Sequence, residues 1–322
     1  MSKGKINILI AGLGAVGGYF GTFLAQNKNL DVCFLSRGKT YEHLKTNPLV
    51  LKSFKGYEIS FKPNVSDDVL SFGKKFDYVF ICTKSQDTSS LIKKIKKVVH
   101  EGSVNVTLQN GIYNLKILKK AFGAKRVMQI ICKIGVEMRN DYVVEHFSLG
   151  FMQIGEMNGK NSMRVEKLYS LLKNSGIDAR VINNMKEEFW IKYAWNTIFN
   201  SHTYISMETV DYFLRQNRIK KFIMPPYDEI ALIAKSQGVE FGEKAYKKII
   251  TDSMALSKFK TSAYQDRKKG KEPETLYFLS ALLEIARKKN IKVIYLERMH
   301  TITSMIFNGD FLDDDEEQTI RS

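Results

Sequence analysis

Residues 6–37 constrain the fold of this chain more than any other stretch. Residues 6–11 are an apolar run that predicts a short buried strand, and the glycine-rich hexapeptide 12–17, GLGAVG, follows at once. Residues 15–26 predict a helix, and residues 31–35 predict a second strand. This order and spacing are typical of the βαβ unit that binds a dinucleotide. The sequence therefore predicts an α/β fold with an N-terminal Rossmann-type domain.

The three glycines of the hexapeptide have separate tasks in such a unit. Gly12 allows a tight turn, because glycine tolerates a positive φ. A side chain at Gly14 would hold the backbone away from a pyrophosphate, and Gly17 lets the helix pack close to the strand. The helix N-terminus then offers unpaired N–H groups and a partial positive charge to the phosphates. The residues expected to bind the cofactor here are Gly12, Leu13, Gly14, Ala15, Val16 and Gly17.

Two other interpretations of this stretch are weaker. Residues 6–27 carry no charge and follow Lys3 and Lys5, a pattern that a signal peptide or a membrane span would share. Glycines, together with Asn7 and Gln26, interrupt the apolar run, and no small-residue cleavage site stands out. A glycine-rich helix–helix contact would leave the two flanking strands unexplained. We therefore expect no membrane partner.

The residues after the second predicted strand indicate which dinucleotide binds. An Asp or Glu there would bind the ribose hydroxyls of NAD, whereas this chain has Ser36 and Arg37. A hydroxyl and a guanidinium suit a 2′-phosphate, which arginine can hold through a bidentate fork. The sequence therefore favours NADPH as the cofactor. The alternative is that Arg37 is an ordinary surface residue.

Length and charge narrow the class of protein. A chain of 322 residues is expected to form two domains. Its 50 Lys and Arg against 34 Asp and Glu give a net charge of +16, and such basic proteins often meet nucleic acid or acidic membranes. Here the lysines are scattered along the chain, without a basic stripe interleaved with aromatic residues. We therefore expect a solvated surface that favours anionic ligands, and no nucleic-acid partner.

The cysteines and histidines predict neither disulfides nor a metal site. Cys33, Cys82 and Cys132 are far apart and form no Cys-x-x-Cys motif. The five histidines include no ligand pair at helical or zinc-finger spacing. This cysteine usage is typical of the reducing cytoplasm. We expect a cytoplasmic protein without a bound metal.

Apolar runs predict the further elements of the first domain. Residues 77–84 predict a central parallel strand with Lys84 at its carboxyl end, and residues 103–108 predict the next strand, which ends at Asn110-Gly111. Ligands bind at the carboxyl ends of such strands, although Asn-Gly is also a common turn. An amphipathic helix is expected over 88–99. Shorter elements are expected as strands at 127–134, 142–146, 151–154 and 179–182, and as a helix at 164–173.

Helical periodicity takes over after Asn184. We expect a dinucleotide-binding domain over residues 1–184 and an all-helical domain over residues 185–310. Residues 311–322 form an acidic C-terminal segment, which we expect to be a solvated tail.

The first predicted helix of the second domain, residues 185–204, carries a polar stripe. Lys192, Asn196 and Asn200 are spaced i, i+4, i+8 and therefore share one face. A cation and two amides on an otherwise apolar helix need partners. The alternative is that Lys192 extends to solvent while the asparagines cap a turn. Ser262 and Glu274, in a later polar stretch, are candidates for substrate contacts, or they belong to a solvated loop.

Several separated motifs resemble those of the ketopantoate reductase (2-dehydropantoate 2-reductase) family. The resemblance covers roughly residues 5–305 and implies a Rossmann-type domain that binds NADPH, followed by a helical domain with a catalytic lysine. The matching stretches, in chain order, are the hexapeptide 12–17, Ser36-Arg37-Gly38, Thr83-Lys84, Leu108-Gln109-Asn110-Gly111, residues 190–200 and residues 262–274.

The resemblance also implies a role for each candidate site residue. Lys192 matches the catalytic lysine, which polarises the 2-oxo group and donates a proton, and Glu274 matches the carboxylate that binds the substrate hydroxyl. Ser262 matches a contact to the substrate carboxylate. Asn196 and Asn200 match amides that orient the substrate. Asn110 matches an active-site asparagine near the nicotinamide, and Lys84 matches a lysine that helps to hold the cofactor or the substrate.

Some positions depart from the family pattern. The family's Asp two residues after the Glu is Leu276, and its Asn-Gly is Leu279-Ser280. Three functions compete: NADPH-dependent reduction of ketopantoate in pantothenate and coenzyme A synthesis, reduction of a different 2-oxo acid, and a non-catalytic NADP-binding regulatory role. We expect a small-molecule 2-oxo acid as the partner, and a homodimer is one assembly that the sequence allows.

Overall fold

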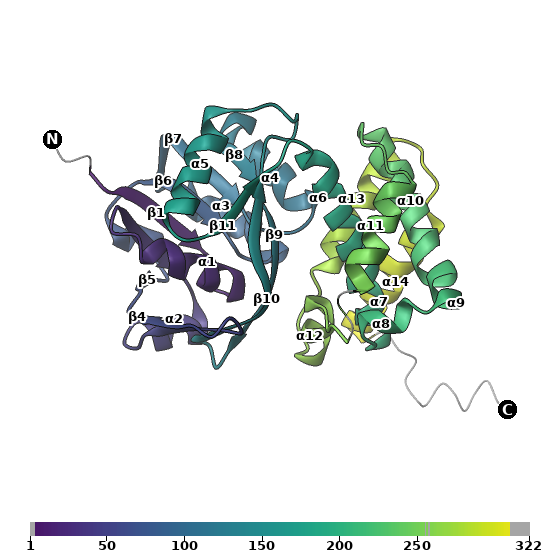
Figure 1. Ribbon diagram of the computed structural model, residues 1–322, viewed down its shortest axis with the longest axis horizontal. Helices are drawn as coiled ribbons and strands as arrows, with labels where there is room; N and C mark the ends of the chain where they lie inside the picture. The colour runs from purple at the N-terminus through teal and green to yellow at the C-terminus, as the bar shows by residue number, and fades with distance from the viewer. Residues whose placement is uncertain (1–3, 255, 257, 310–322) are drawn as a thin grey trace. The chain divides into compact units, whose positions relative to one another are not determined.

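The computed structural model describes residues 4–254, 256 and 258–309. The chain divides into two compact units between Lys186 and Glu187 (Figure 1). The first unit is an α/β structure and the second is helical, which confirms the predicted fold class. The acidic segment 311–322, expected to be a solvated tail, lies outside the described residues.

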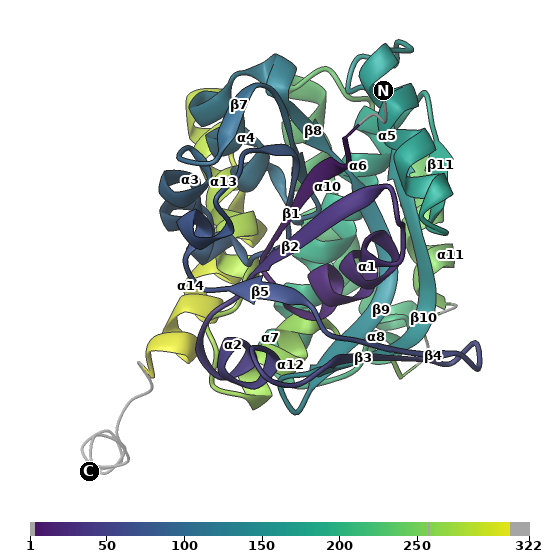
Figure 2. The ribbon, with the colours of Figure 1, turned by 90° about the vertical axis from the view of Figure 1, so that its left-hand side faces the viewer.

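A six-stranded parallel sheet forms the centre of the first unit (Figure 2). Its order, β5-β2-β1-β6-β7-β8, is the 3-2-1-4-5-6 order of a doubly wound Rossmann sheet. The strands are β1 Ile6–Ala11, β2 Leu30–Leu35, β5 Asn64–Ser66, β6 Phe76–Ile81, β7 Val99–Thr107 and β8 Val127–Gln129. The α-helices α1 to α5 of this unit are α1 Ala15–Ala25, α2 Gly38–Leu44, α3 Thr88–Ile95, α4 Ile112–Phe122 and α5 Met163–Asn174.

Both faces of this sheet are buried. Alternate residues of a strand point to opposite faces, so Ile8 and Ile10 of β1 join one apolar core with α1 and α5. Leu9 and Ala11 join the other core, with α3 and α4. Burial on both sides explains why β1 is an unbroken apolar run and not an alternating pattern.

A second, five-stranded sheet, which the sequence analysis did not anticipate, packs on the α1 side of the first. Its order is β11-β10-β3-β4, and β9 pairs antiparallel with β10. Leu49 and Val144 of this sheet share the core that contains α1. The strands are β3 Leu49–Ser53, β4 Glu58–Phe61, β9 Ile131–Arg139, β10 Val143–Ile154 and β11 Asp178–Val181.

Several predicted elements have other bounds in the structure. The strand expected over 127–134 is two strands in different sheets, β8 and β9, while the strands expected over 142–146 and 151–154 are one, β10. Register shifts in β10, where Leu149 has φ 57° and Gly150 φ 112°, interrupt its alternation. The helix expected over 88–99 ends at Ile95, because the backbone at Val98 and Val99 pairs with Phe76.

The glycines of α1 let the helix lie close to three strands. A Cβ on Gly17 would overlap the carbonyl oxygen of Gly12, which has φ 110°. A Cβ on Gly18 would meet Val144 of β10, and one on Gly21 would meet Phe34 of β2. At Gly14, by contrast, a Cβ would meet no atom within 4 Å. The glycines after Gly14 therefore serve packing between the two sheets.

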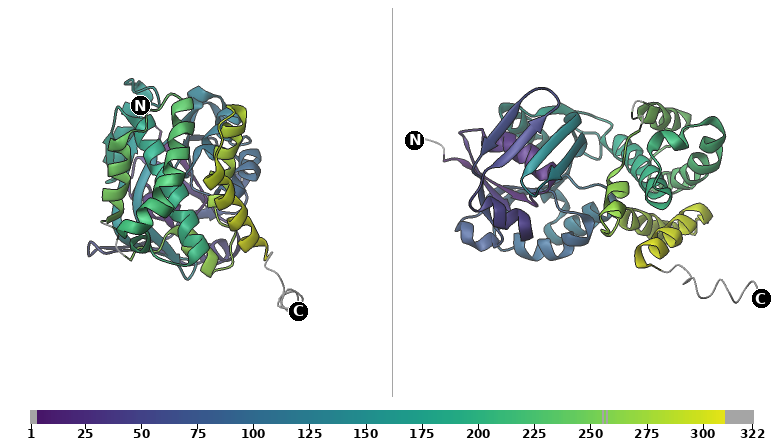
Figure 3. Two further views of the ribbon diagram at one scale, coloured as in Figure 1. Left: turned by 90° about the vertical axis from the view of Figure 1, so that its right-hand side faces the viewer. Right: turned by 90° about the horizontal axis from the view of Figure 1, so that it is seen from below.

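The second unit contains helices from α6 onward (green to yellow in Figure 3). Among the described residues, none of its helices or those of the first unit is both long and apolar enough to cross a membrane. Its helices of six residues or more are α6 Met185–Trp195, α7 Ser201–Ser206, α10 Met224–Ser236, α11 Glu243–Met254, α12 Ser262–Lys268, α13 Thr275–Lys288 and α14 Ile294–Asn308.

The helix expected over 185–204 is interrupted by a π-helical turn, Asn196–Asn200, between α6 and α7. His202 stabilises this turn, because its Nδ1–H donates a hydrogen bond of 2.7 Å to the carbonyl oxygen of Ile198. The rings of Phe213 and Phe222 contact the imidazole. Burial lowers the pKa of His202 to about 4, although its bond to Ile198 opposes the shift.

We expect Gly17→Ala to destabilise the first unit by about 1–3 kcal/mol, because the added methyl group would overlap backbone that cannot move aside. Gly14→Ala is the matched control and should change stability by less than about 1 kcal/mol, because its Cβ side is open. Amide hydrogen exchange of β1 in the full chain measures the stability of this unit. Equal effects of the two substitutions would contradict the packing role assigned to Gly17.

We expect the second unit to lose stability as the pH falls from about 6.5 toward 4. An unfolded histidine has a pKa near 6.5, so below that pH the unfolded chain binds a proton that folded His202 excludes. The contribution of neutral His202 to the free energy of unfolding is fully present above pH 6.5. It falls by about 2–3 kcal/mol as the pH drops through this window. Urea unfolding followed by the fluorescence of Trp190 and Trp195, the two tryptophans of the chain, measures it.

His202→Gln should flatten this pH dependence, because glutamine does not titrate in the window. His300→Gln is the control, since burial and the charge of Arg287 also lower the pKa of His300. We expect the larger effect at His202, because two phenylalanine rings contact its imidazole edge-to-face. Identical pH profiles for His202→Gln and the unmodified chain would show that this imidazole does not govern the stability of the unit.

Candidate functional site

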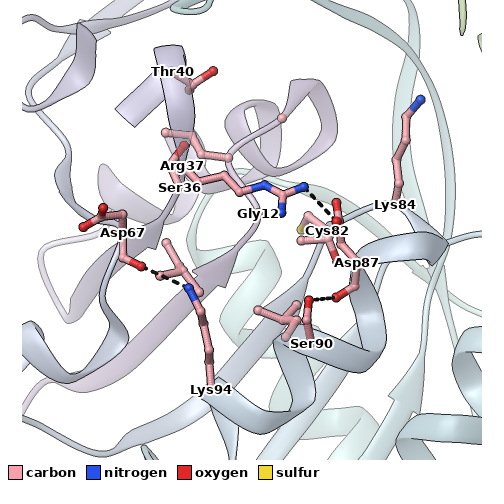
Figure 4. Close-up of a pocket in the computed structure, with 15 residues that line it drawn as sticks. Gly12, Ser36, Arg37, Thr40, Asp67, Cys82, Lys84, Asp87, Ser90 and Lys94 are labelled. Carbon is pink, nitrogen blue, oxygen red and sulfur yellow. Dashed lines mark hydrogen bonds and ion pairs between the residues drawn. The ribbon is translucent and has the colours of Figure 1, made fainter. Parts of the chain in front are cut away.

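A cavity of about 290 Å³ lies at the carboxyl ends of β1, β2 and β6 in the first unit (Figure 4). Parallel sheets of this order bind ligands at that edge. Of the residues expected to bind the cofactor, those that line the cavity are Gly12, Leu13, Gly14, Ser36, Arg37 and Lys84. The remaining ones are Ala15, Val16 and Gly17, which begin α1, and Asn110, which follows β7.

The N-terminus of α1 opens onto this cavity at Gly14. Gly14 is exposed and precedes the first residue of the helix, and no side chain caps it. The first N–H groups of a helix have no partner within it, and the helix dipole adds partial positive charge there. A glycine turn with an open Cβ side at a helix N-terminus fits the pyrophosphate of a dinucleotide.

Arg37, at the end of β2, forms an ion pair with Asp87 across the cavity. The Nη2 atom of Arg37 lies 2.7 Å from Oδ1 of Asp87, and the side chains are 75% and 28% exposed. Ser36 is buried, and its backbone N–H donates to the carbonyl oxygen of Ser66 at 3.0 Å. The sequence analysis missed Asp87, because Arg37 and Asp87 are fifty residues apart and no local pattern links them.

Two further side chains define the chemistry of this cavity. Lys94 reaches its edge, and its ammonium donates to the carbonyl oxygen of Asp67 at 3.3 Å. Cys82 lines it beside Gly12, and burial raises the pKa of this thiol well above its usual value. The cavity therefore presents a neutral thiol, three cations and two carboxylates, Asp67 and Asp87. The excess of cations suits an anionic ligand, and the neutral thiol does not suit thiolate chemistry.

A buried network of amides and hydroxyls holds the ends of β6 and β7 together. Nε2 of Gln109 donates to the carbonyl oxygen of Thr83 and to Oγ1 of Thr88, both at 2.7 Å. The Thr88 hydroxyl donates to Oδ1 of Asn114 at 2.9 Å. Nδ2 of Asn114 then donates to the carbonyl oxygen of Asn110 at 3.0 Å. The network fixes the loops that carry Lys84 and Asn110.

In the second unit, Lys192 and the two asparagines lie on α6 and the π turn that follows it. Lys192 is half-buried in the last turn of α6, whereas Asn196 and Asn200 are 7% and 3% exposed. Within the described part of the chain, Nδ2 of Asn196 has no hydrogen-bond partner. A buried amide without a partner costs free energy unless a ligand or water satisfies it. In the same described part, Oγ1 of Thr197 and Oε2 of Glu188 are also without a hydrogen-bond partner, and Asn196 is the one of the three that belongs to the polar stripe with Lys192.

The π turn affects how these side chains align. Four residues exceed one turn of an α-helix, so a stripe at i, i+4 and i+8 would rotate around the axis. A π turn closes i→i+5 hydrogen bonds and holds more residues in each turn, which opposes that rotation. Lys192, Asn196 and Asn200 thus share a face over a longer stretch than a regular helix allows. Periodicity alone could not reveal this turn.

Ser262 and Glu274 begin the helices that pack against the π turn. Ser262 is exposed at the first position of α12, and half-buried Glu274 directly precedes α13. Both helices contact the turn. Buried hydroxyl pairs at 2.6 Å also tie α7 to the starts of α13 and α12: Ser201 with Thr275, and Thr203 with Thr261.

The departures from the family pattern have different surroundings. Leu279 is fully buried, so this side chain belongs to the helical core. Ser280 is exposed, and its Oγ lies 2.9 Å from Nε2 of His300 on α14. Leu276 is half-buried, two residues after Glu274. Leu276 is thus the departure nearest to Glu274 along the chain.

The second unit therefore gathers an ammonium, two amides, a hydroxyl and a carboxylate on helices that pack together. These groups can bind a small molecule that carries an oxo group, a carboxylate and a hydroxyl. Among the described residues there is no cluster of three or more His, Cys, Asp or Glu side chains that could hold a metal ion.

Comparison with known proteins identifies a family for both units. The family model "Ketopantoate reductase PanE/ApbA" matches residues 8–159, and the model "Ketopantoate reductase PanE/ApbA C terminal" matches residues 184–306. An uncharacterised oxidoreductase of Bacillus subtilis (strain 168), YkpB, is 27% identical over 309 residues, which cover 93% of this chain and 98% of that protein.

Two solved structures resemble the chain over most of its length. The 2-dehydropantoate 2-reductase of Geobacter metallireducens GS-15 has a TM-score of 0.84 at 25% identity, covering 93% of this chain and 99% of that one. A D-mandelate dehydrogenase, solved with NADH and anilino(oxo)acetate, has a TM-score of 0.86 at 18% identity, covering 94% and 99%, and shows a shared fold. Both units match this architecture, and the chain belongs to the ketopantoate reductase family of dinucleotide-dependent oxidoreductases.

Proposed function

We propose that this protein reduces ketopantoate (2-dehydropantoate) to pantoate with NADPH, a step in the synthesis of pantothenate and coenzyme A. The observation that carries the proposal is the buried, unpartnered amide of Asn196 on the π turn that follows Lys192. It implies a polar ligand in the helical unit, one helical turn from Lys192, the expected catalytic cation. The family and the 2-dehydropantoate 2-reductase of similar structure support the same reaction.

The first unit fits NADPH through its glycine turn and its cations. The open Cβ side of Gly14 leaves room for the pyrophosphate, and Ser36 and Arg37 would bind the 2′-phosphate. Lys84 and Asn110, at neighbouring strand ends, would hold the nicotinamide half. When bound, NADPH supplies the hydride that reduces the 2-oxo carbon.

The residues of the helical unit supply the proton and the orientation in this proposal. The ammonium of Lys192 donates a hydrogen bond and then a proton to the 2-oxo oxygen, where negative charge develops. Glu274 accepts a hydrogen bond from the substrate hydroxyl, and Ser262 donates one to the substrate carboxylate. Asn196 and Asn200 orient the substrate between these groups, which satisfies the Asn196 amide.

A second candidate is an NADPH-dependent reductase of a different 2-oxo acid. Leu276, half-buried near Glu274, favours it, because an apolar side chain there suits a substrate with a less polar tail. The similar fold of a D-mandelate dehydrogenase supports it as well. The presence of both Lys192 and Glu274 argues against a purely regulatory NADP-binding protein. A homodimer and a cytoplasmic location stay predictions.

We expect Arg37→Ala to weaken NADPH binding roughly 10–100-fold, because a hydrogen bond to a charged group contributes about 1.5–3 kcal/mol. NADH, which has no 2′-phosphate, should bind almost as before. Fluorescence titration of the purified full chain with each cofactor measures both dissociation constants. If the unmodified protein bound the two cofactors equally, the NADPH assignment would be wrong.

We expect Lys192→Met to lower kcat by about 10²–10⁴, the usual effect of losing a general acid. Methionine keeps the apolar stem of the side chain but removes the ammonium, so NADPH binding and the overall fold should be retained. Stopped-flow and steady-state oxidation of NADPH at 340 nm measure the rate. Near-normal turnover of this variant would make Lys192 a solvent-facing lysine without a catalytic role.

We expect 2-oxoisovalerate, which lacks the hydroxymethyl group of ketopantoate, to be a much poorer substrate. A site built to bind a hydroxyl rejects an analogue without it, because the analogue cannot donate the hydrogen bond that the Glu274 carboxylate accepts from ketopantoate. Glu274→Gln should reduce the difference in kcat/KM between the two acids. Equal kcat/KM values for the two acids in the unmodified enzyme would favour the reductase of a different 2-oxo acid.

A further inference from the structure

We propose that Asp87 is a specificity-determining residue of the cofactor cavity. Its carboxylate pairs with Arg37 and thereby reduces the advantage that this arginine gives to NADPH over NADH. The proposal rests on the proposed role of Arg37 in binding the 2′-phosphate. It adds a residue of opposite charge that sets how strong the preference is.

The pair spans the cavity between two elements. Arg37 follows β2, Asp87 directly precedes α3, and both line the same cavity. Their side chains meet at 2.7 Å, and Figure 4 shows the guanidinium of Arg37 extended across the cavity toward Asp87. Any 2′-phosphate held by Arg37 would therefore lie close to the Asp87 carboxylate.

The Asp87 carboxylate has no local structural task among the described contacts. Asp87 occupies the residue before α3, but its side chain makes no capping hydrogen bond to the helix. The hydroxyl of Ser90 donates to the backbone carbonyl oxygen of Asp87, not to its carboxylate. The interaction that the structure gives to this carboxylate is the one with Arg37.

Charge explains the effect on cofactor choice. The carboxylate occupies an N–H group that the arginine fork would otherwise offer to a phosphate. It also places a negative charge beside a phosphate dianion, and like charges at such range repel. NADH has no phosphate at this position, so neither the occupied N–H group nor the charge repulsion affects its binding. The pair thus weakens NADPH selectively.

The experiment compares Asp87→Asn with the unmodified full chain, measuring the dissociation constants of NADPH and NADH. Asparagine keeps the size of the side chain and is as good a residue before a helix as aspartate. We expect NADPH to bind roughly 3–20-fold more tightly, a range typical of removing one nearby like charge at a partly exposed site. The dissociation constant of NADH should change by less than about twofold, and the gain for NADPH should shrink as salt screens the charges.

Asp178→Asn is the matched control. Asp178 pairs with Arg180 at 2.8 Å on the surface of the same unit, and neither residue lines the cavity. This substitution changes the net charge by the same amount, so any general charge effect on cofactor binding appears in it. We expect neither cofactor to bind differently.

The double variant Arg37→Ala, Asp87→Asn tests whether Asp87 acts through Arg37. We expect the double variant to bind NADPH no more than about twofold more tightly than Arg37→Ala alone. Without Arg37 there is no guanidinium that the loss of the Asp87 charge could free for the phosphate. A full gain in the double variant would overturn the proposed route through Arg37. An equal gain for NADPH and NADH in Asp87→Asn, or no gain for NADPH, would overturn the proposal itself.

The outcome for Arg37→Ala separates this inference from the proposed function. If Arg37→Ala weakens NADPH and Asp87→Asn leaves it unchanged, the role of Asp87 is wrong while the cofactor assignment stands. If Arg37→Ala leaves NADPH unchanged, the 2′-phosphate site is wrong and the inference fails with it.

Discussion

The close approach of α1 to β1 is the constraint on which the first unit depends. The backbone of the helix at Gly17 lies so near the carbonyl oxygen of Gly12 that no side chain fits between them. Gly18 and Gly21 extend this contact to the second sheet and to β2, so the helix packs between the two sheets on its glycines. This packing places the N-terminus of α1 at the carboxyl edge of the parallel sheet, where Gly14 lines the cavity.

Polar contacts between residues far apart in the sequence position the loops at this edge. Gln109 and Thr88 link the ends of β6 and β7, and Asn114 holds the backbone of Asn110. Because these groups are buried, each lost bond would leave a polar atom unsatisfied in a medium of low dielectric constant. The loops at the cavity are therefore rigid although they contain little regular structure. The pair of exposed Arg37 and half-buried Asp87 is the part of this edge that a charged ligand can rearrange.

Local patterns in the sequence predicted the parts of the fold that depend on neighbouring residues. Three such parts lie within thirty residues of each other: the apolar run of β1, the hexapeptide and the helix after it. Each can be recognised from its own local sequence pattern. The second sheet was missed, because β3 and β4 are short, and β3 joins them to β10, which lies some ninety residues later in the chain. The partner of Arg37 was missed for the same reason, since it comes from another element fifty residues away.

The helical unit shows a different limit of sequence analysis. Spacing placed Lys192, Asn196 and Asn200 on one face, but it assumed a regular helix, and a π turn interrupts that helix at Asn196. Such a turn costs regular hydrogen bonding, and here the imidazole of His202 compensates by bonding to the Ile198 carbonyl. The same turn carries a buried amide without a partner. An irregular turn that holds an unsatisfied donor in place is what a preorganised binding site requires, since a ligand that pairs with the donor removes the cost of its burial.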